Sequence, residues 1–191
     1  MPEHRSTYDD GLEIRAVRES ERVSAGAATA LAYREFAPDG SPQYAEYLVR
    51  IADVAARSAQ AIVLVALNHG IVAGSATLEV DRRFEFDATE PLALDEAHLR
   101  MLGVAPEHRG RGIARGLVIA CADLAAQRGK ARLTLDTTAS MEAAQALYTR
   151  LGFQRAGVRH TPSGLELIHY EATLPLAAAG APAPITGGRD C

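Results

Sequence analysis

The sequence contains few of the residues that hold small domains together by covalent or metal links. Its 191 residues include two cysteines, Cys121 and Cys191, and no tryptophan. Two cysteines cannot form a disulfide framework or a cysteine-rich zinc site, so we expect a cytoplasmic protein. The six histidines show no metal-ligand spacing either, and we predict no metal site.

Long apolar runs are also missing. No run reaches the ~18 residues that a membrane helix needs, and residues 1–10 lack the apolar core of a secretory signal. Lysine occurs once, at Lys130, among 20 basic residues, and the net charge is −4. Because a dedicated nucleic-acid-binding protein normally has a basic excess, we expect neither a nucleic acid nor a membrane as a partner.

The sequence has the pattern of one mixed domain, with 48% hydrophobic and 23% charged residues as in ordinary globular proteins. We expect a flexible N-terminus over 1–10, a domain over 11–174 and a flexible, alanine-, proline- and glycine-rich tail over 175–191. Apolar patterns predict strands at 12–17, 61–67, 71–80, 96–104, 132–138, from 153 onward and at 165–174. Helices are predicted at 19–32, from 41 to about 55, at 112–128 and from 140. Residues 81–95 form a charged loop long enough to cover a site. This order is typical of an α/β (α+β) fold.

The strongest local signal is a glycine loop, VAPEHRGRGIARG at 104–116, between a predicted strand and a predicted helix. Gly110 and Gly112 lack a Cβ atom, so a ligand can come close to the backbone N–H groups. The helix start adds further N–H groups and a partial positive charge. The arginines around this turn are Arg109, Arg111 and Arg115. Three guanidinium groups around a glycine turn predict a site for a multiply charged phosphate ligand.

Two phosphate-binding patterns fit this loop less well. The Walker pattern needs Gly-Lys-Ser/Thr, but Gly116 is followed by leucine and valine. A dinucleotide fingerprint is a closer match, since Asp136 ends the next strand, where a ribose-binding acid would lie. However, five residues including Pro106 separate Val104 from Gly110, and the chain has no room for six parallel strands. A nicotinamide-cofactor oxidoreductase is therefore the weaker alternative.

With its surroundings, the loop resembles the phosphate motif of the GCN5-related N-acetyltransferase (GNAT) family. The family motif Arg/Gln-x-x-Gly-x-Gly/Ala reads here as Arg109, Gly110, Arg111, Gly112, Ile113 and Ala114. The preceding strand LRMLGV and the helix ending AxxLYxxLGF at Ala144–Phe153 also match, and the resemblance covers residues 12–174. It implies a single-domain GNAT fold, a mixed and mostly antiparallel central sheet that is splayed at the acetyl-CoA site and flanked by helices.

The resemblance implies acetyl-CoA as cosubstrate and suggests which residues bind it. The pyrophosphate would lie on the backbone N–H groups of residues 109–114, and we add Arg115 because it lies in the first helical turn. The pantetheine arm would pair with the backbone of Leu102, Gly103 and Val104. A backbone N–H group near Leu102 would polarise the thioester carbonyl and hold the oxyanion.

Two positions near the last predicted helix also follow from the resemblance. Tyr148 matches the family tyrosine that protonates the departing thiolate, although helical spacing alone is equally typical of a core tyrosine. Relatives often have asparagine where this chain has Met141, and methionine cannot repeat the hydrogen bond of an asparagine side chain. Ser140 or Thr138 could replace it.

The general base is less well defined by the sequence. Many relatives carry glutamate where this chain has His98, and a neutral imidazole can also take a proton near pH 7. Glu96, Glu79 or a water molecule stay as alternatives. Strand alternation predicts one shared face for His98, Arg100, Leu102 and Val104.

Together these patterns predict an enzyme that transfers an acetyl group from acetyl-CoA to a primary amine by direct attack in a ternary complex. We expect a small-molecule amine rather than a peptide or protein as acceptor, but the sequence does not identify it. The resemblance also suggests a homodimer through the last strands. The alternative from another class is an acyl-CoA-binding module without catalysis.

Overall fold

The computed structural model describes residues 6–8, 11–38, 40–81, 91–161 and 164–176. Its strands form one eight-stranded sheet in the order β1-β2-β3-β4-β5-β6-β8-β7. The strands are β1 (Ser6–Tyr8), β2 (Leu12–Ala16), β3 (Ile62–Asn68), β4 (Ile71–Glu79), β5 (Glu96–Val104), β6 (Arg132–Thr137), β7 (Gln154–His160) and β8 (Glu166–Thr173). Among these strands only β5 and β6 are parallel neighbours. A dinucleotide-binding fold needs a doubly wound parallel sheet, so this topology excludes the nicotinamide alternative.

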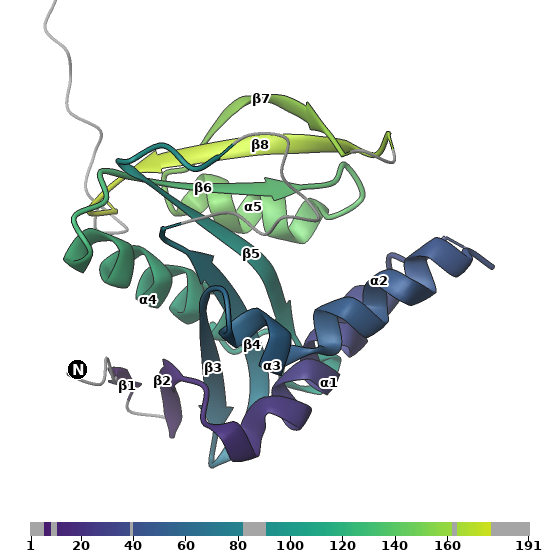
Figure 1. Cartoon of the computed structure of the whole chain (residues 1–191). Coiled ribbons are helices and arrows are strands. Elements are labelled where there is room, and N and C mark those ends of the chain that lie inside the picture. Colours follow the sequence, from purple (N-terminus) through teal and green to yellow (C-terminus); the bar gives the residue numbers. More distant parts are fainter. Residues whose placement is uncertain (1–5, 9–10, 39, 82–90, 162–163, 177–191) are drawn as a thin grey trace, which may run out of the picture.

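Helices cover both faces of the sheet (Figure 1). They are α1 (Arg22–Arg34), α2 (Pro42–Ala52), α3 (Val54–Ser58), α4 (Ile113–Gln127) and α5 (Glu142–Arg150), with short 3₁₀ turns at Glu19–Glu21 and Pro106–His108. Side chains of β3 alternate between two clusters: Leu64 packs in the core of α4 and α5, whereas Val65 packs with α1 and α3. None of the helices in the described part of the chain is long and apolar enough to span a membrane.

The structure buries the thiol of Cys121 and corrects one predicted helix. Cys121 is completely buried in α4, and burial raises the pKa of its thiol to about 12. The helix expected from 41 to about 55 begins as predicted, because the Ser41 hydroxyl accepts a hydrogen bond from the Tyr44 amide at 3.2 Å. It ends at Ala52, however, because the Asp53 carboxylate caps a new helix by accepting from the Ala56 amide at 2.9 Å.

The ends of the chain differ in part from the expected flexible segments. Within residues 1–10, the strand β1 pairs with β2 in an antiparallel register. Within the expected tail, Leu176 packs against the main core, and residues 177–191 lie outside the described part. Most of the charged loop at 81–95 also lies outside it, since residues 82–90 are not described.

The splay predicted between the two central strands is confirmed. β5 and β6 pair in parallel from Glu96↔Arg132 to Leu99↔Leu135, and their pairing ends there. Beyond this point β6 stays paired with β8, and β5 stays paired with β4 as far as Val104. Figure 1 shows β5 turning away from β6, so a wedge opens between the two strands.

A bulge in β5 corrects the predicted alternation of its side chains. Arg100 pairs with Thr77 and Gly103 with Ser75, so Met101 and Leu102 together oppose a single residue of β4, and Met101 has a φ of 52°. Beyond the bulge, the even-numbered residues of β5 face the opposite side of the sheet from the even-numbered residues before it. Leu102 and Val104 pack in the core of α4, whereas a Cβ atom at Gly103 would lie 3.2 Å from the Cβ atom of Ala32 in α1. His98 and Arg100 therefore do not share a face with Leu102 and Val104.

The contact between α1 and α2 depends on a glycine. A Cβ atom on Gly26 would overlap the carbonyl oxygen of Ala52 and lie 2.9 Å from its carbonyl carbon. We predict that Gly26→Ala lowers the free energy of unfolding by about 1–3 kcal/mol, as overpacking does, although alanine is the better helix former. Urea denaturation measures the change.

The matched control is Ala27→Gly at the exposed neighbouring position of the same helix. It should cost about 1 kcal/mol through helix propensity alone. If Gly26→Ala is as stable as the wild type or more stable, helix propensity dominates and the proposed close contact does not constrain the fold.

Candidate active site

The glycine loop forms a cradle at the start of α4. Gly110 and Gly112 have φ values of 75° and 74°, which residues with a Cβ atom rarely adopt. No atom lies within 4 Å of the position where a Cβ atom of either glycine would be, so the space above the turn is open. Gly112 is the N-cap of α4 and offers no side chain to the first N–H groups of the helix. This arrangement suits an anionic group that accepts backbone hydrogen bonds.

The three arginines of the predicted cluster differ in their surroundings. The Arg109 guanidinium turns to α1, where it donates to Glu35 at 2.9 Å and to the carbonyl of Ala32 at 3.4 Å, and it also donates to the Val104 carbonyl at 3.2 Å. Arg109 therefore ties the loop to the ends of α1 and β5. The other two arginines, Arg111 and Arg115, are exposed beside the loop.

A small pocket lies between the glycine loop, β2 and the β3–β4 turn. Its volume is about 310 Å³, and it is lined by Leu12, Asn68, His69, Arg111 and Ile113. Arg111 therefore lines a pocket beside the β3–β4 turn, whereas Arg109 contacts α1. No group of three or more histidine, cysteine or acidic side chains in the described residues could hold a metal ion.

The wedge between β5 and β6 exposes backbone that a ligand can use. Residues 100–104 of β5 have no strand partner on the β6 side among the described residues. This stretch contains Leu102, Gly103 and Val104, and it leads directly into the glycine loop. Backbone N–H and C=O groups that no neighbouring strand takes up can pair with an extended, amide-containing ligand. The predicted binding residues of the strand and of the loop thus form one continuous surface.

Tyr148 of α5 packs in the main core, on the same face of the sheet as α4. It is 6% exposed, and its ring packs at 5.9 Å from the ring of Phe153 and 6.1 Å from that of Tyr170. Burial raises the pKa of the Tyr148 hydroxyl well above its usual value. The phenol therefore keeps its proton at neutral pH, as a proton donor must.

The helix expected from 140 begins at Glu142. Met141 is its N-cap, and the Met141 side chain makes no capping hydrogen bond. The Ser140 hydroxyl instead lies 2.9 Å from that of Thr138. Gln145 stabilises the turn from within the helix, since its amide donates to the carbonyls of Thr138 and Ala139 at 3.1 Å each.

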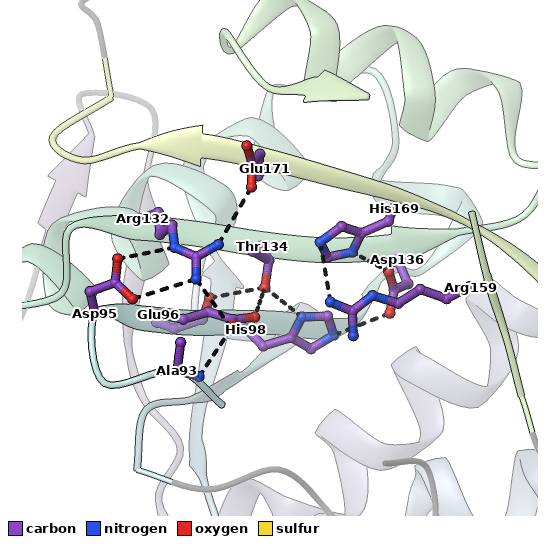
Figure 2. Close-up of polar contacts among 11 residues, drawn as sticks. Ala93, Asp95, Glu96, His98, Arg132, Thr134, Asp136, Arg159, His169 and Glu171 are labelled. Carbon is purple, nitrogen blue, oxygen red and sulfur yellow. Dashed lines mark hydrogen bonds and ion pairs between the residues drawn. The ribbon is translucent and has the colours of Figure 1, made fainter. Parts of the chain in front are cut away.

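A row of polar side chains crosses β5, β6 and β8 on the face opposite α4 (Figure 2). His98 lies at its centre and is 4% exposed. Its Nδ1 atom is 2.8 Å from the Thr134 hydroxyl, and that hydroxyl donates to Glu96 Oε1 at 2.7 Å. The Nε2 atom of His98 is 3.8 Å from Asp136 Oδ2. The predicted base is therefore buried within a network and has specific neighbours at both ring nitrogens.

The same row continues to β8 and β7. Asp136 Oδ1 lies 2.6 Å from His169 Nδ1, and His169 Nε2 lies 3.4 Å from the Arg159 guanidinium. Burial opposes ionisation of Asp136, but the His169 hydrogen bond and the neighbouring positive charges outweigh it, so the pKa of Asp136 is lowered. Asp136 stays ionised at neutral pH and is a poor proton acceptor.

No sequence motif indicates the Asp136–His169 pair, because its two residues are 33 positions apart in the chain. The available signal is the alternation of the two strands: Leu133 and Leu135 of β6 pack in the core, which places Thr134 and Asp136 on the other face. A polar residue at the alternate positions of two neighbouring strands indicates a shared polar face.

The two alternative carboxylate bases are both held by other groups. Glu79 is completely buried and forms an ion pair with Arg100 at 3.0 Å. Glu96 is 5% exposed, and its second carboxylate oxygen accepts from the Ala93 amide at 3.2 Å.

The fold agrees with the comparisons to known proteins. A model of the acetyltransferase (GNAT) family matches residues 27–153, and the chain belongs to this family. It is 40% identical over 72 residues to the ribosomal protein bS18-alanine N-acetyltransferase of Escherichia coli strain K12, which is 38% of this chain and 49% of that relative. The chain thus matches less than half the length of this relative.

Solved structures show the same fold along nearly the whole chain. The ribosomal-protein-S18-alanine N-acetyltransferase of Escherichia coli has a TM-score of 0.61 at 23% identity, covering 90% of this chain and 99% of that one. The structure of yncA from Salmonella typhimurium, solved with its cofactor acetyl-CoA, has a TM-score of 0.64 at 22% identity. It covers 91% of this chain and 98% of that one.

The charged row makes the stability of the protein depend on pH. Because the folded-state pKa of Asp136 is lowered, its stabilising contribution is present above the unfolded-state pKa of ~3.9 and is lost as pH falls through the folded-state value. We predict that Asp136→Asn lowers the free energy of unfolding by about 1–3 kcal/mol at pH 7. The difference from the wild type should shrink below about pH 4.

Urea denaturation at a series of pH values measures this effect. Asp123→Asn is the matched control, because it removes the same charge from an exposed position on α4. A difference between wild type and Asp136→Asn that stays constant from pH 7 to pH 3 would show that the Asp136 carboxylate is not stabilised by its neighbours.

Proposed function

We propose that the protein transfers an acetyl group from acetyl-CoA to a primary amine by direct attack within a ternary complex. The observation that carries this proposal is the wedge between β5 and β6, which opens beyond the Leu99↔Leu135 pair and ends at the glycine cradle. An extended cosubstrate with a pyrophosphate at one end and amide groups along its arm matches this surface in both charge and hydrogen-bonding pattern.

The residues of the wedge fit acetyl-CoA in order along the chain. The backbone N–H groups of 109–114 and the exposed Arg115 would bind the pyrophosphate. Leu102, Gly103 and Val104 would pair with the pantetheine arm, and an N–H group near Leu102 would hold the oxyanion. Arg109 contributes by holding the loop against α1 and β5 rather than by contacting phosphate with its guanidinium.

Tyr148 is the proposed general acid. The amine attacks the thioester carbon, the carbon–sulfur bond breaks, and Tyr148 donates its hydroxyl proton to the departing thiolate. The phenolate then takes the second proton of the acetylated nitrogen. The Tyr148 ring is held in one place by its contacts with the rings of Phe153 and Tyr170, which supports this role.

His98 is the proposed general base. An acceptor amine is protonated at neutral pH and must lose a proton before it attacks. The N–H bond of the ammonium breaks and the proton moves to His98, directly or through one water molecule, and later reaches the solvent. The position of His98 beside the start of the wedge supports this assignment over Glu79 and Glu96.

The acceptor remains a proposal at the level of chemical class. We favour a small-molecule amine. A relative of this chain is named for the alanine of ribosomal protein bS18, so a peptide with an N-terminal alanine belongs in any acceptor panel.

The test is a mass-spectrometric assay of wild-type protein with acetyl-CoA and a panel of amines and peptides. We expect acetylation of at least one primary amine together with release of free CoA. Gly112→Asp should abolish CoA binding measured by calorimetry, because it adds a side chain and a negative charge to the cradle. CoA binding without any acetyl transfer would favour the non-catalytic module.

Gly129→Asp is the matched control for the cradle. Gly129 has a φ of 76° with open space at its Cβ position and follows the other end of α4, so the backbone strain is the same and only the location differs. If both variants lose CoA equally, the loss comes from strain rather than from the cradle.

Tyr148→Phe tests the acid role separately. The substitution keeps the ring packing and removes only the hydroxyl, so we expect kcat to fall by roughly 10²-fold or more while CoA affinity and the unfolding midpoint stay close to wild type. Steady-state kinetics and calorimetry on the same preparation measure both. Wild-type turnover of Tyr148→Phe would remove Tyr148 as the acid.

A further inference from the structure

We propose that Thr134, with Glu96 behind it, is a positioning residue that fixes His98 in the Nδ1–H tautomer and so makes Nε2 the atom that accepts the proton of the amine. This inference rests on the proposed function, because it concerns the base of that reaction. It adds two residues that neither the glycine motif nor the tyrosine motif indicates.

The tautomer follows from the single proton of the Thr134 hydroxyl. Thr134 Oγ1 lies 2.7 Å from Glu96 Oε1 and 3.3 Å from the carbonyl oxygen of Ala97. Both of these atoms can only accept, so the hydroxyl proton goes to one of them. The Thr134 oxygen is then left to accept from His98 Nδ1, 2.8 Å away, and that nitrogen must carry a proton.

The contacts of Glu96 favour an ionised carboxylate, which is the form that accepts the Thr134 hydroxyl proton. Its Oε2 atom accepts from the Ala93 amide at 3.2 Å and lies 3.8 Å from the Arg132 guanidinium. Both groups favour the ionised carboxylate, which cannot donate to Thr134. The direction of the hydrogen bonds therefore runs from His98 through Thr134 to Glu96.

The Nε2 side of the His98 ring is the side that accepts a proton from the amine. In the Nδ1–H tautomer the lone pair is on Nε2, which lies 3.8 Å from Asp136 Oδ2, a distance too long for a direct hydrogen bond. An acceptor ammonium at this point transfers a proton to Nε2 as its N–H bond breaks. The imidazolium formed then faces the ionised Asp136, whose Oδ1 is held by His169.

The charges around His98 favour this protonation. Glu79 opposes His98 in the β4 register but is already paired with Arg100, so these two charges largely offset each other. The other described charged or titratable groups on the surrounding elements are Glu96 of β5, Arg132 and Asp136 of β6, Arg159 of β7, His169 of β8 and Arg57 of α3. Among these described groups, Asp136 has a carboxylate oxygen 3.8 Å from Nε2, so a proton on Nε2 faces an anion.

The first test is the tautomer itself, read from two-bond ¹H–¹⁵N correlations of the His98 ring in the wild-type full chain without cosubstrate. We expect an Nδ1–H ring above its titration and loss of this preference in Thr134→Val. Thr134→Ser keeps the hydroxyl and should restore it. Thr137→Val is the matched control, because Thr137 lies on the same strand and its buried hydroxyl has no hydrogen-bond partner among the described residues. It should leave the His98 tautomer unchanged.

The second test is the pH profile of kcat/KM. Thr134→Val should lower the plateau by roughly 10-fold or more and move the acidic limb to lower pH, because the imidazolium loses its Nδ1–H acceptor. Thr134→Ser should lie near the wild type. Since the wild-type spectrum needs no variant, a Thr134→Val protein that does not fold leaves the first test intact.

The outcomes separate this inference from the proposed function. An Nε2–H ring in a wild-type protein that acetylates amines would overturn the inference alone, as would an unchanged tautomer and pH profile in Thr134→Val. An Nδ1–H ring in a protein that acetylates no amine would overturn the proposed function, and the role of His98 as base with it.

Discussion

The site depends on the way in which β5 leaves the sheet at Met101. Two residues of β5 oppose one of β4 there, and such a bulge increases the local twist of the strand. The parallel pairing with β6 ends at Leu99, two residues before the bulge, while β6 stays bonded to β8. The wedge is therefore closed at its base by a regular sheet and open where the glycine loop begins. A cosubstrate that completes the pairing would replace the missing strand partner along β5.

The bulge also determines which chemistry lies on which side of the wedge. Before it, His98 faces the polar row of β6 and β8, and beyond it Leu102 faces the core of α4 and α5, which also contains Tyr148. The proposed base and the proposed acid thus reach the wedge from opposite faces of the sheet. Proton removal from the amine and proton delivery to the thiolate can then occur at opposite sides of the reacting carbon. A regular strand without the bulge would keep His98 and Leu102 on the same face of the sheet.

Local patterns in the sequence were enough to predict most elements, the glycine loop and the tyrosine helix, because periodicity and turn residues act over a few positions. They were not enough for the bulge. Strand reasoning assumes a period of two, and Met101 adopts a positive φ although it is not a glycine. The contact of Arg109 with α1 and the pairing of Asp136 with His169 join segments 77 and 33 residues apart. No local pattern contains such partners, so they follow only from the register of the folded sheet.

Stability alone does not explain the polar row. Replacing a buried ion pair by apolar side chains of similar volume is often neutral or stabilising, so burying Glu96, His98 and Asp136 together is not needed to hold a sheet. The row instead sets the direction of the hydrogen bonds at the His98 ring. A lone buried imidazole exchanges between two tautomers, whereas one whose Nδ1 atom meets a hydroxyl that must accept has a single basic nitrogen. The hydrogen bonds that compensate the burial of these polar groups are also the ones that orient the His98 ring. One set of contacts therefore offsets the cost of desolvation and supports the proposed proton transfer.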